Sequence, residues 1–244
     1  MAQGALAGRQ GSEPALLERP GWLLGTAAVL RKDLTIELRT GEVVTTSSLF
    51  ALLVVVMASL AFYGGPETGR LVAAGVIWLS VAFAAVLALG RTWQREREEG
   101  ALDALLVAPV PRSAVFAGKA LGVGVFVGIV ELVVLPVAAV LFALDFEQVG
   151  GGLLLIAVVA TPGIAASGTL FGALTVRTRA RDLLLAIVLF PLLAPTLLCA
   201  VAATRELFNG VPLFELVDYF ELMAVFDLTF VAGGLALFGT LVEG

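Results

Sequence analysis

The chain has 244 residues, of which 59% are hydrophobic and 14% are charged, with a formal net charge of −5. Soluble domains carry about 25% charged residues, so this composition, with its apolar residues in blocks of membrane-spanning length, excludes an ordinary soluble protein. The sequence has no histidine and one cysteine, Cys199, which excludes histidine-based catalysis, histidine ligation of zinc or haem, and an internal disulfide.

The chain begins with a segment that predicts a tail and then a helix on the membrane surface. Residues 1–20 contain three glycines and two prolines and are expected to form a flexible cytoplasmic tail, while residues 21–244 form one membrane domain. The apolar run at 23–30 is not a signal peptide, because charged residues follow where a cleavage site would stand. One face of the predicted helix carries Leu23, Ala27, Leu30, Leu34 and Leu38, and the other carries Lys32, Thr35 and Arg39. This pattern predicts an amphipathic helix in the cytoplasmic interface.

Six apolar runs follow, each long enough to cross about 30 Å of hydrocarbon as a helix. They lie near residues 43–63, 71–90, 120–144, 150–175, 183–203 and 222–242. The sequence therefore predicts an all-α, polytopic membrane protein with six transmembrane helices.

Lys and Arg are distributed on one side of this arrangement. Thirteen of them lie before the first span, in the loop at 91–119, or between the fourth and fifth spans, whereas Arg70 and Arg205 alone lie on the other side. Because cytoplasmic loops are rich in Lys and Arg, both termini are expected in the cytoplasm.

The loop at 91–119 is the longest cytoplasmic segment and predicts a short amphipathic helix. Its charged part includes Glu96, Arg97, Glu98 and Glu99, and its apolar part consists of Leu102, Leu105 and Leu106 at helical spacing. Two prolines, at 109 and 111, then end the helix. We expect these seven residues to dock a soluble cytoplasmic partner, the leucines as buried anchors and the charges as a polar rim. A solvated loop with a helical turn on the lipid is the alternative.

The chain carries no nucleotide-binding loop of its own. Such a loop needs a Lys-Ser/Thr pair after glycines, whereas Lys119 is followed by Ala120, and Ser113 stands in place of the first glycine. We expect no intrinsic catalytic site, no nucleic-acid partner and no metal or cofactor bound by this chain.

One carboxyl group, Glu131, stands near the middle of the third predicted span. A carboxylate there is costly unless it is protonated, paired or facing a cavity, so a role in translocation or coupling is one interpretation. A neutral acid hydrogen-bonded to a neighbouring helix is the other. Asp227 is the one further acid well inside a span, and this scarcity disfavours a proton-coupled carrier.

Glycines recur at four-residue spacing in the third and fourth spans. The pairs are Gly118/Gly122, Gly124/Gly128 and Gly168/Gly172. Small residues at this spacing let helix backbones approach closely, and we expect packing within the fold before a dimer interface. Beyond the fifth span, acids recur every three residues in 213–221, which predicts an amphipathic helix at the outer interface.

Residues 96–113 read EREEGALDALLVAPVPRS and resemble the first cytoplasmic loop of the CcmB family, the permease of the cytochrome c maturation ABC transporter. The opening RKDLTIELR at 31–39 and the run FALLVVV at 50–56 are similar to the start of that family. The similarity extends over about residues 25–243.

This resemblance implies an ABC-2 type permease in the bacterial cytoplasmic (inner) membrane. It implies a homodimer paired with a separate ATPase subunit that binds ATP, and haem-handling membrane subunits that take part in haem export or in release of a haem-loaded periplasmic chaperone. Two alternatives stay open: an ABC-2 permease exporting another amphiphile, such as a lipid, polysaccharide or drug, and a non-transporting scaffold that couples ATPase strokes to partner release. A continuous groove lined by Glu131 favours transport, and the absence of a polar cavity favours the scaffold.

Overall fold

The described part of the chain consists of helices and short connections. The computed structural model describes residues 21–62, 64–98, 107–175 and 181–243. In chain order the helices are α1 (Trp22–Thr40), α2 (Glu42–Ala61), α3 (Pro66–Glu98), α5 (Arg112–Leu141), α6 (Phe146–Thr175), α7 (Arg181–Phe208), the 3-10 helix η1 (Leu213–Glu215) and α8 (Val217–Glu243). No strand occurs in these four ranges, and the all-α prediction is confirmed. The predicted tail at 1–20 lies outside the described residues.

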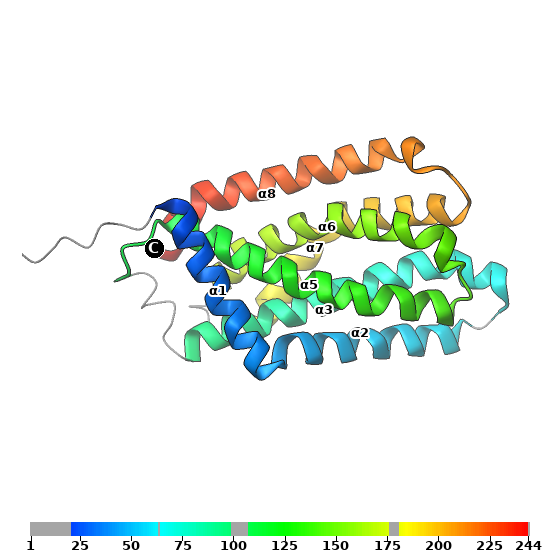
Figure 1. The fold of residues 1–244 in the computed structure, drawn as a ribbon, viewed down its shortest axis with the longest axis horizontal. Helices are drawn as coiled ribbons and strands as arrows, with labels where there is room; N and C mark the ends of the chain where they lie inside the picture. Colours follow the sequence, from blue (N-terminus) through cyan, green and yellow to red (C-terminus); the bar gives the residue numbers. More distant parts are fainter. Residues whose placement is uncertain (1–20, 63, 99–106, 176–180, 244) are drawn as a thin grey trace, which may run out of the picture.

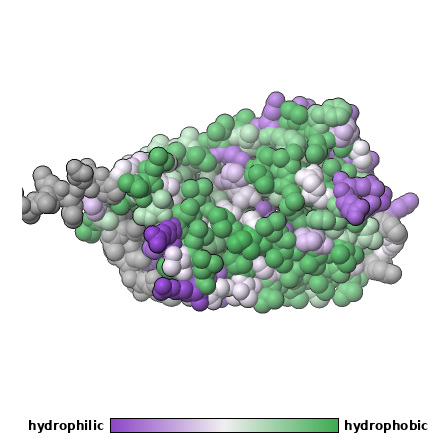
Figure 2. All heavy atoms as spheres, in the orientation of Figure 1, coloured by the Kyte–Doolittle hydropathy of each residue, from purple (hydrophilic) through white to green (hydrophobic). Residues whose placement is uncertain are grey.

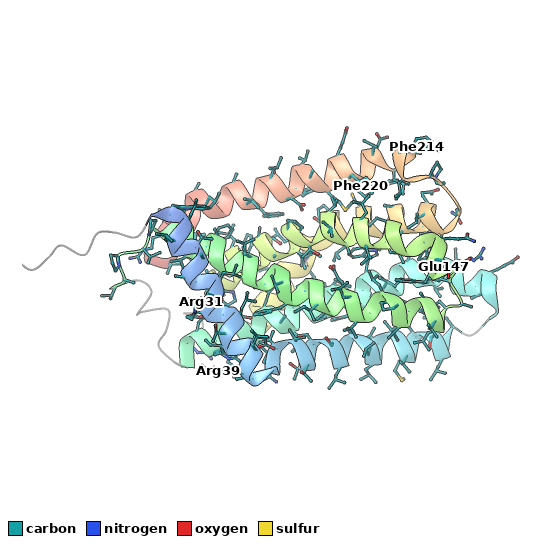
Figure 3. All side chains as sticks on the ribbon, in the orientation of Figure 1. Arg31, Arg39, Glu147, Phe214 and Phe220 are labelled. Atoms are coloured by element: carbon teal, nitrogen blue, oxygen red, sulfur yellow. The ribbon has the colours of Figure 1, made fainter. Side chains whose placement is uncertain are left out.

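Within the described ranges, six helices are long and apolar enough to cross a membrane, in the number and order that hydropathy predicts: α2, α3, α5, α6, α7 and α8. They run alternately up and down one elongated bundle, so α1, the end of α3 and the C-terminal end of α8 lie together (Figure 1). Arg31 and Arg39 lie at this end, called the α1 end, and Glu147 and Phe214 at the opposite end (Figure 3).

The second and third spans reach further toward the α1 end than predicted. Helix α3 continues to Glu98 and α5 begins at Arg112, so the residues between 91 and 98 form helix where a loop was expected. Glutamine, glutamate and arginine are good helix formers, and several charges of this stretch find partners on α1 and α2. Residues 99–111 therefore connect the two helices. Lys119, which was expected in the loop, lies within α5.

Helix α1 confirms the helix expected before the first span. It crosses the α1 end of the bundle at an angle and packs mainly on α5 (Figure 1). Its buried residues are Gly25, Thr26, Val29, Asp33 and Glu37. Leu23 is 75% exposed and Leu38 is 89% exposed, so these leucines point away from the protein while a small and acidic face packs against it. Gly41, with φ 61° in the left-handed region, makes the tight turn into α2.

Two of the three glycine pairs allow neighbouring helices to approach closely within the fold, as predicted. Gly118 and Gly122 let α1 lie against α5, because a Cβ on Gly118 would be 2.8 Å from the backbone oxygen of Thr26. Gly168 and Gly172 of α6 lie directly against side chains of α3. Larger residues at these positions would push the helices apart.

The amphipathic helix predicted for 213–221 is wrong as a separate element. The segment forms η1 and then the first turns of α8, which starts at Val217. Leu216 is fully buried, whereas Phe214 is 74% exposed. A continuous α8 satisfies backbone groups that a separate surface helix would leave free at its ends.

The surface between the two ends is apolar. Figure 2 shows mostly hydrophobic side chains over the middle of one face, with hydrophilic groups gathered mainly toward the ends. Helix α8 is the least covered of the six spans: 17% of its apolar window is buried, against 61% for α3. One side of the bundle thus remains open beside α8.

Candidate functional site

Three helices meet at a buried ammonium group near the α1 end. Lys119 of α5 is 1% exposed, and its Nζ lies 3.0 Å from Oδ1 and 2.9 Å from Oδ2 of Asp33 on α1. Its Nζ also donates to Oε1 of Glu96 on α3. A buried charge is tolerated only when it is paired and hydrogen-bonded, and Lys119 meets both conditions.

Lys32 of α1 pairs with the same two carboxylates, and its side chain is more exposed than that of Lys119. Its Nζ donates to Oε1 of Glu96 and lies 3.3 Å from Oδ1 of Asp33. Partial burial disfavours the charged ammonium, but the nearby Asp33 and Glu96 carboxylates outweigh it and raise the pKa of Lys32. The ring of Trp93 lies under Lys119, with 5.9 Å from Nζ to the ring centroid, a distance at which a cation is attracted by the ring face.

A second group of charges ties the end of α3 to the turn between α1 and α2. Glu37 accepts hydrogen bonds from the backbone N–H groups of Val43, at 3.3 Å, and Val44, at 2.8 Å, and so satisfies two free donors of α2. Arg95 of α3 lies 3.8 Å from Oε2 of Glu37 and donates to Oε2 of Glu42 at 3.1 Å.

We refer to these eight residues as the ion network. Its cations are Lys32, Arg91, Arg95 and Lys119, and its carboxylates are Asp33, Glu37, Glu42 and Glu96. Four charges of each sign balance, so burial leaves no net charge. The network fastens the last turns of α3, from which residues 99–111 continue, to α1, α2 and α5. The ion network therefore connects four helices at the α1 end.

The docking residues predicted from sequence do not all lie on the surface of the protein. Glu96 was expected in an exposed rim and this is wrong, because its carboxylate is 4% exposed and faces Lys119. Arg97 is partly exposed near the end of α3, and Glu98 is the last residue of that helix. The other predicted docking residues, Glu99, Leu102, Leu105 and Leu106, lie outside the described residues. Sequence reasoning missed Lys119, although its position between glycine and alanine at the head of an apolar run was a signal.

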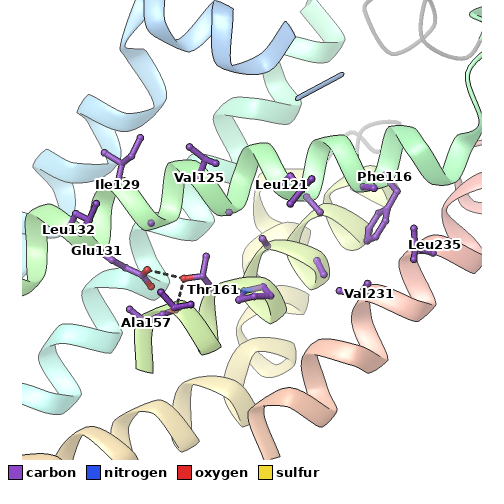
Figure 4. Close-up of a pocket in the computed structure, with 18 of the residues that line it drawn as sticks. Phe116, Leu121, Val125, Ile129, Glu131, Leu132, Ala157, Thr161, Val231 and Leu235 are labelled. Atoms are coloured by element: carbon purple, nitrogen blue, oxygen red, sulfur yellow. Dashed lines mark hydrogen bonds between the residues drawn. The ribbon is translucent and has the colours of Figure 1, made fainter. Parts of the chain in front are cut away.

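The mid-span acid, Glu131, is 3% exposed and contacts the neighbouring helix α6. Its Oε2 lies 2.8 Å from Oγ1 of Thr161, and the same Oγ1 lies 2.7 Å from the carbonyl oxygen of Ala157 (Figure 4). A hydroxyl has one proton and the carbonyl can only accept it, so this geometry fits a protonated Glu131 that donates to Thr161. Oε1 of Glu131 has no hydrogen-bond partner among the described residues.

Glu131 lies at the floor of a groove with a volume of about 750 Å³ between α5, α6 and α8 (Figure 4). The walls are mostly apolar, and Thr161 is the other polar group beside Glu131. Asp227 of α8 lies instead against Gly163, two positions along α6 from Thr161 and hence on a different side of that helix. The groove suits an apolar occupant with one polar group.

Fold and site together define a polytopic α-helical membrane protein with an ion-linked surface helix and no catalytic constellation among its described residues. The sequence model of the family described as "CcmB protein" matches residues 25–238. The chain belongs to the CcmB family.

Curated relatives extend this match over most of both chains. Heme exporter protein B of Bradyrhizobium diazoefficiens is 32% identical over 75% of this chain and 82% of its own length. Heme exporter protein B of Rhodobacter capsulatus is 33% identical over 73% and 82%, and that of Escherichia coli K12 is 28% identical over 72% and 79%.

Proposed function

We propose that this protein is the permease subunit of a bacterial ABC transporter for haem export in cytochrome c maturation. The observation that carries the proposal is the family match over residues 25–238, together with relatives named Heme exporter protein B. These relatives favour this function over export of a lipid, polysaccharide or drug.

A separate ATPase subunit supplies the energy in this proposal. Lys119 is the one lysine in a glycine-lysine pair, and it is buried between Asp33 and Glu96, where no phosphate can reach it. ATP therefore binds to a soluble partner, and the segment at 97–106 receives that partner. The ion network then transmits its movement, because α3 cannot shift at this end without pulling on α1 and α5.

The proposal also covers the orientation of the protein in the membrane and its further partners. The α1 end, which carries most of the Lys and Arg, faces the cytoplasm, with both termini on that side. The permease works as a homodimer with a separate ATPase subunit, alongside membrane subunits that handle haem. This chain binds no cofactor itself.

Deletion and complementation test the function. Cells that lack this gene should contain no haem-stained c-type cytochromes, and the tagged wild-type protein should restore them and copurify with an ABC ATPase. Quantifying copies of each chain in that complex by native mass spectrometry checks the homodimer. Normal cytochrome c in the deletion strain, or a complex with no ATPase, contradicts the proposal.

A further inference from the structure

The groove beside α8 is lined by a stripe of small residues that no part of the described chain covers. Ala120, Gly124 and Gly128 follow one another at four-residue spacing along α5 and all line it. A Cβ on Gly124 would meet only ordinary contacts at 3.6 Å and 3.8 Å, and one on Gly128 would meet no atom within 4 Å. The Gly118/Gly122 and Gly168/Gly172 pairs, by contrast, are filled by α1 and α3.

The length of the groove favours a helix over a lipid tail as its occupant. Its lining runs along α5 from Phe116 to Leu132, a rise of about 24 Å for an α-helix. One leaflet contributes about half of the roughly 30 Å hydrocarbon core, so a single acyl chain fills only part of this length. A transmembrane helix spans all of it, and small residues at four-residue spacing are the surface on which such helices pack closely.

Glu131 favours an occupant that carries a polar group. Its Oε1 is buried without a hydrogen-bond partner in the described chain, while Oε2 is held by Thr161. Glu131 itself lines the groove, so this unpartnered oxygen belongs to a side chain that an occupant would contact. A hydrogen-bond donor on the occupant would satisfy this oxygen, and in hydrocarbon such bonds hold helices together.

We propose that the groove between α5, α6 and α8 binds a transmembrane helix of another membrane subunit, through the Ala120–Gly124–Gly128 stripe and a donor that reaches Oε1 of Glu131. The occupant presents small residues to the stripe and a serine, threonine, asparagine, glutamine or lysine at the depth of Glu131. The sparse burial of α8 leaves the side entrance open for it. The inference rests on the proposed function in one respect: the proposed complex contains the other membrane subunits.

Photocrosslinking in the native complex identifies the occupant. A benzophenone amino acid at Val125, which lines the groove, should capture a membrane protein, with the adduct mapped by mass spectrometry to a transmembrane helix. The same probe at Leu79, which is 48% exposed on α3 and does not line the groove, should not capture that helix. Capture of lipid alone, of a second copy of this chain, of a soluble protein or of nothing overturns the proposal.

Groove-filling variants test the contact itself. Gly128→Leu should reduce copurification of the captured subunit about 30-fold, as loss of a central interface anchor does, and Gly75→Leu, on an exposed glycine of α3 with equal space, should not. Glu131→Gln keeps an acceptor oxygen and should retain the subunit, whereas Glu131→Leu should lose it about tenfold. ATPase copurification should stay unchanged in all four variants, which separates this proposal from the proposed function. Full retention of the subunit in Gly128→Leu overturns the inference.

Discussion

At the scale of single residues, Lys119 is the most deeply buried charged residue in the described part of the chain. It is almost completely buried, it pairs with Asp33 and Glu96, and the ring of Trp93 lies beneath it. Lys32 pairs with the same carboxylates but keeps 31% of its side chain exposed. Because water screens the exposed partner, the two lysines should differ in what they contribute to stability.

Substitution of Lys119 measures this difference. Lys119→Met should lower the free energy of unfolding by about 3–5 kcal/mol, because it leaves two buried carboxylates with only the half-exposed lysine. Lys32→Met, the matched control, should cost about 1 kcal/mol or less. Thermal unfolding of the purified protein in detergent gives both values. Equal losses for the two variants would show that burial does not distinguish the lysines.

At the scale of elements, the ion network joins the end of α3 to α1, α2 and α5. The helix is held by the ion network up to Glu96, and residues 99–111 connect it to α5. A force applied by a docked ATPase to residues 102–106 would therefore reach α1, α2 and α5 together. The leucines of that segment are the expected contact with the partner.

The double substitution Leu105→Ala with Leu106→Ala tests this contact. Truncating buried apolar anchors often costs more than about 2 kcal/mol of binding, so ATPase copurification should fall about 30-fold or more and c-type cytochromes should be lost. Arg97→Gln, which removes one partly exposed charge, should have little effect. Immunoblots of membranes should show normal insertion of both variants, and full ATPase association in the double variant would assign the segment to the lipid surface.

The elements that could be predicted from sequence are those whose signal is local. Hydropathy alone locates the six spans, and the leucine spacing from Leu23 to Leu38 predicts α1. The ends of α3 and α5 could not be predicted, because charges at 91–98 indicate a solvated loop unless their partners on α1 and α2 are known. Glu96 was placed in a rim for the same reason. A pairing between residues 33, 96 and 119 exists only once three helices have met.

At the scale of the whole molecule, the two ends of the bundle differ. One end gathers α1 and the ion network, and the other carries short connections and η1. The groove lies between them at membrane depth. The sequence located Glu131, but the groove and the open stripe required the positions of α6 and α8, which no local pattern encodes.

The α1 end is expected to face the cytoplasm, where a soluble ATPase can reach it. Single cysteines at positions 67, 147 and 215 probe the opposite end, one at 97 probes the α1 end, and one at 179 probes the segment between α6 and α7, in a protein whose native Cys199 is buried. With a membrane-impermeant maleimide, intact spheroplasts should label 67, 147 and 215, whereas 97 and 179 should react only after the membrane is permeabilised. Labelling of 97 in intact spheroplasts would contradict the orientation, the docking of the ATPase and the coupling role of the ion network together.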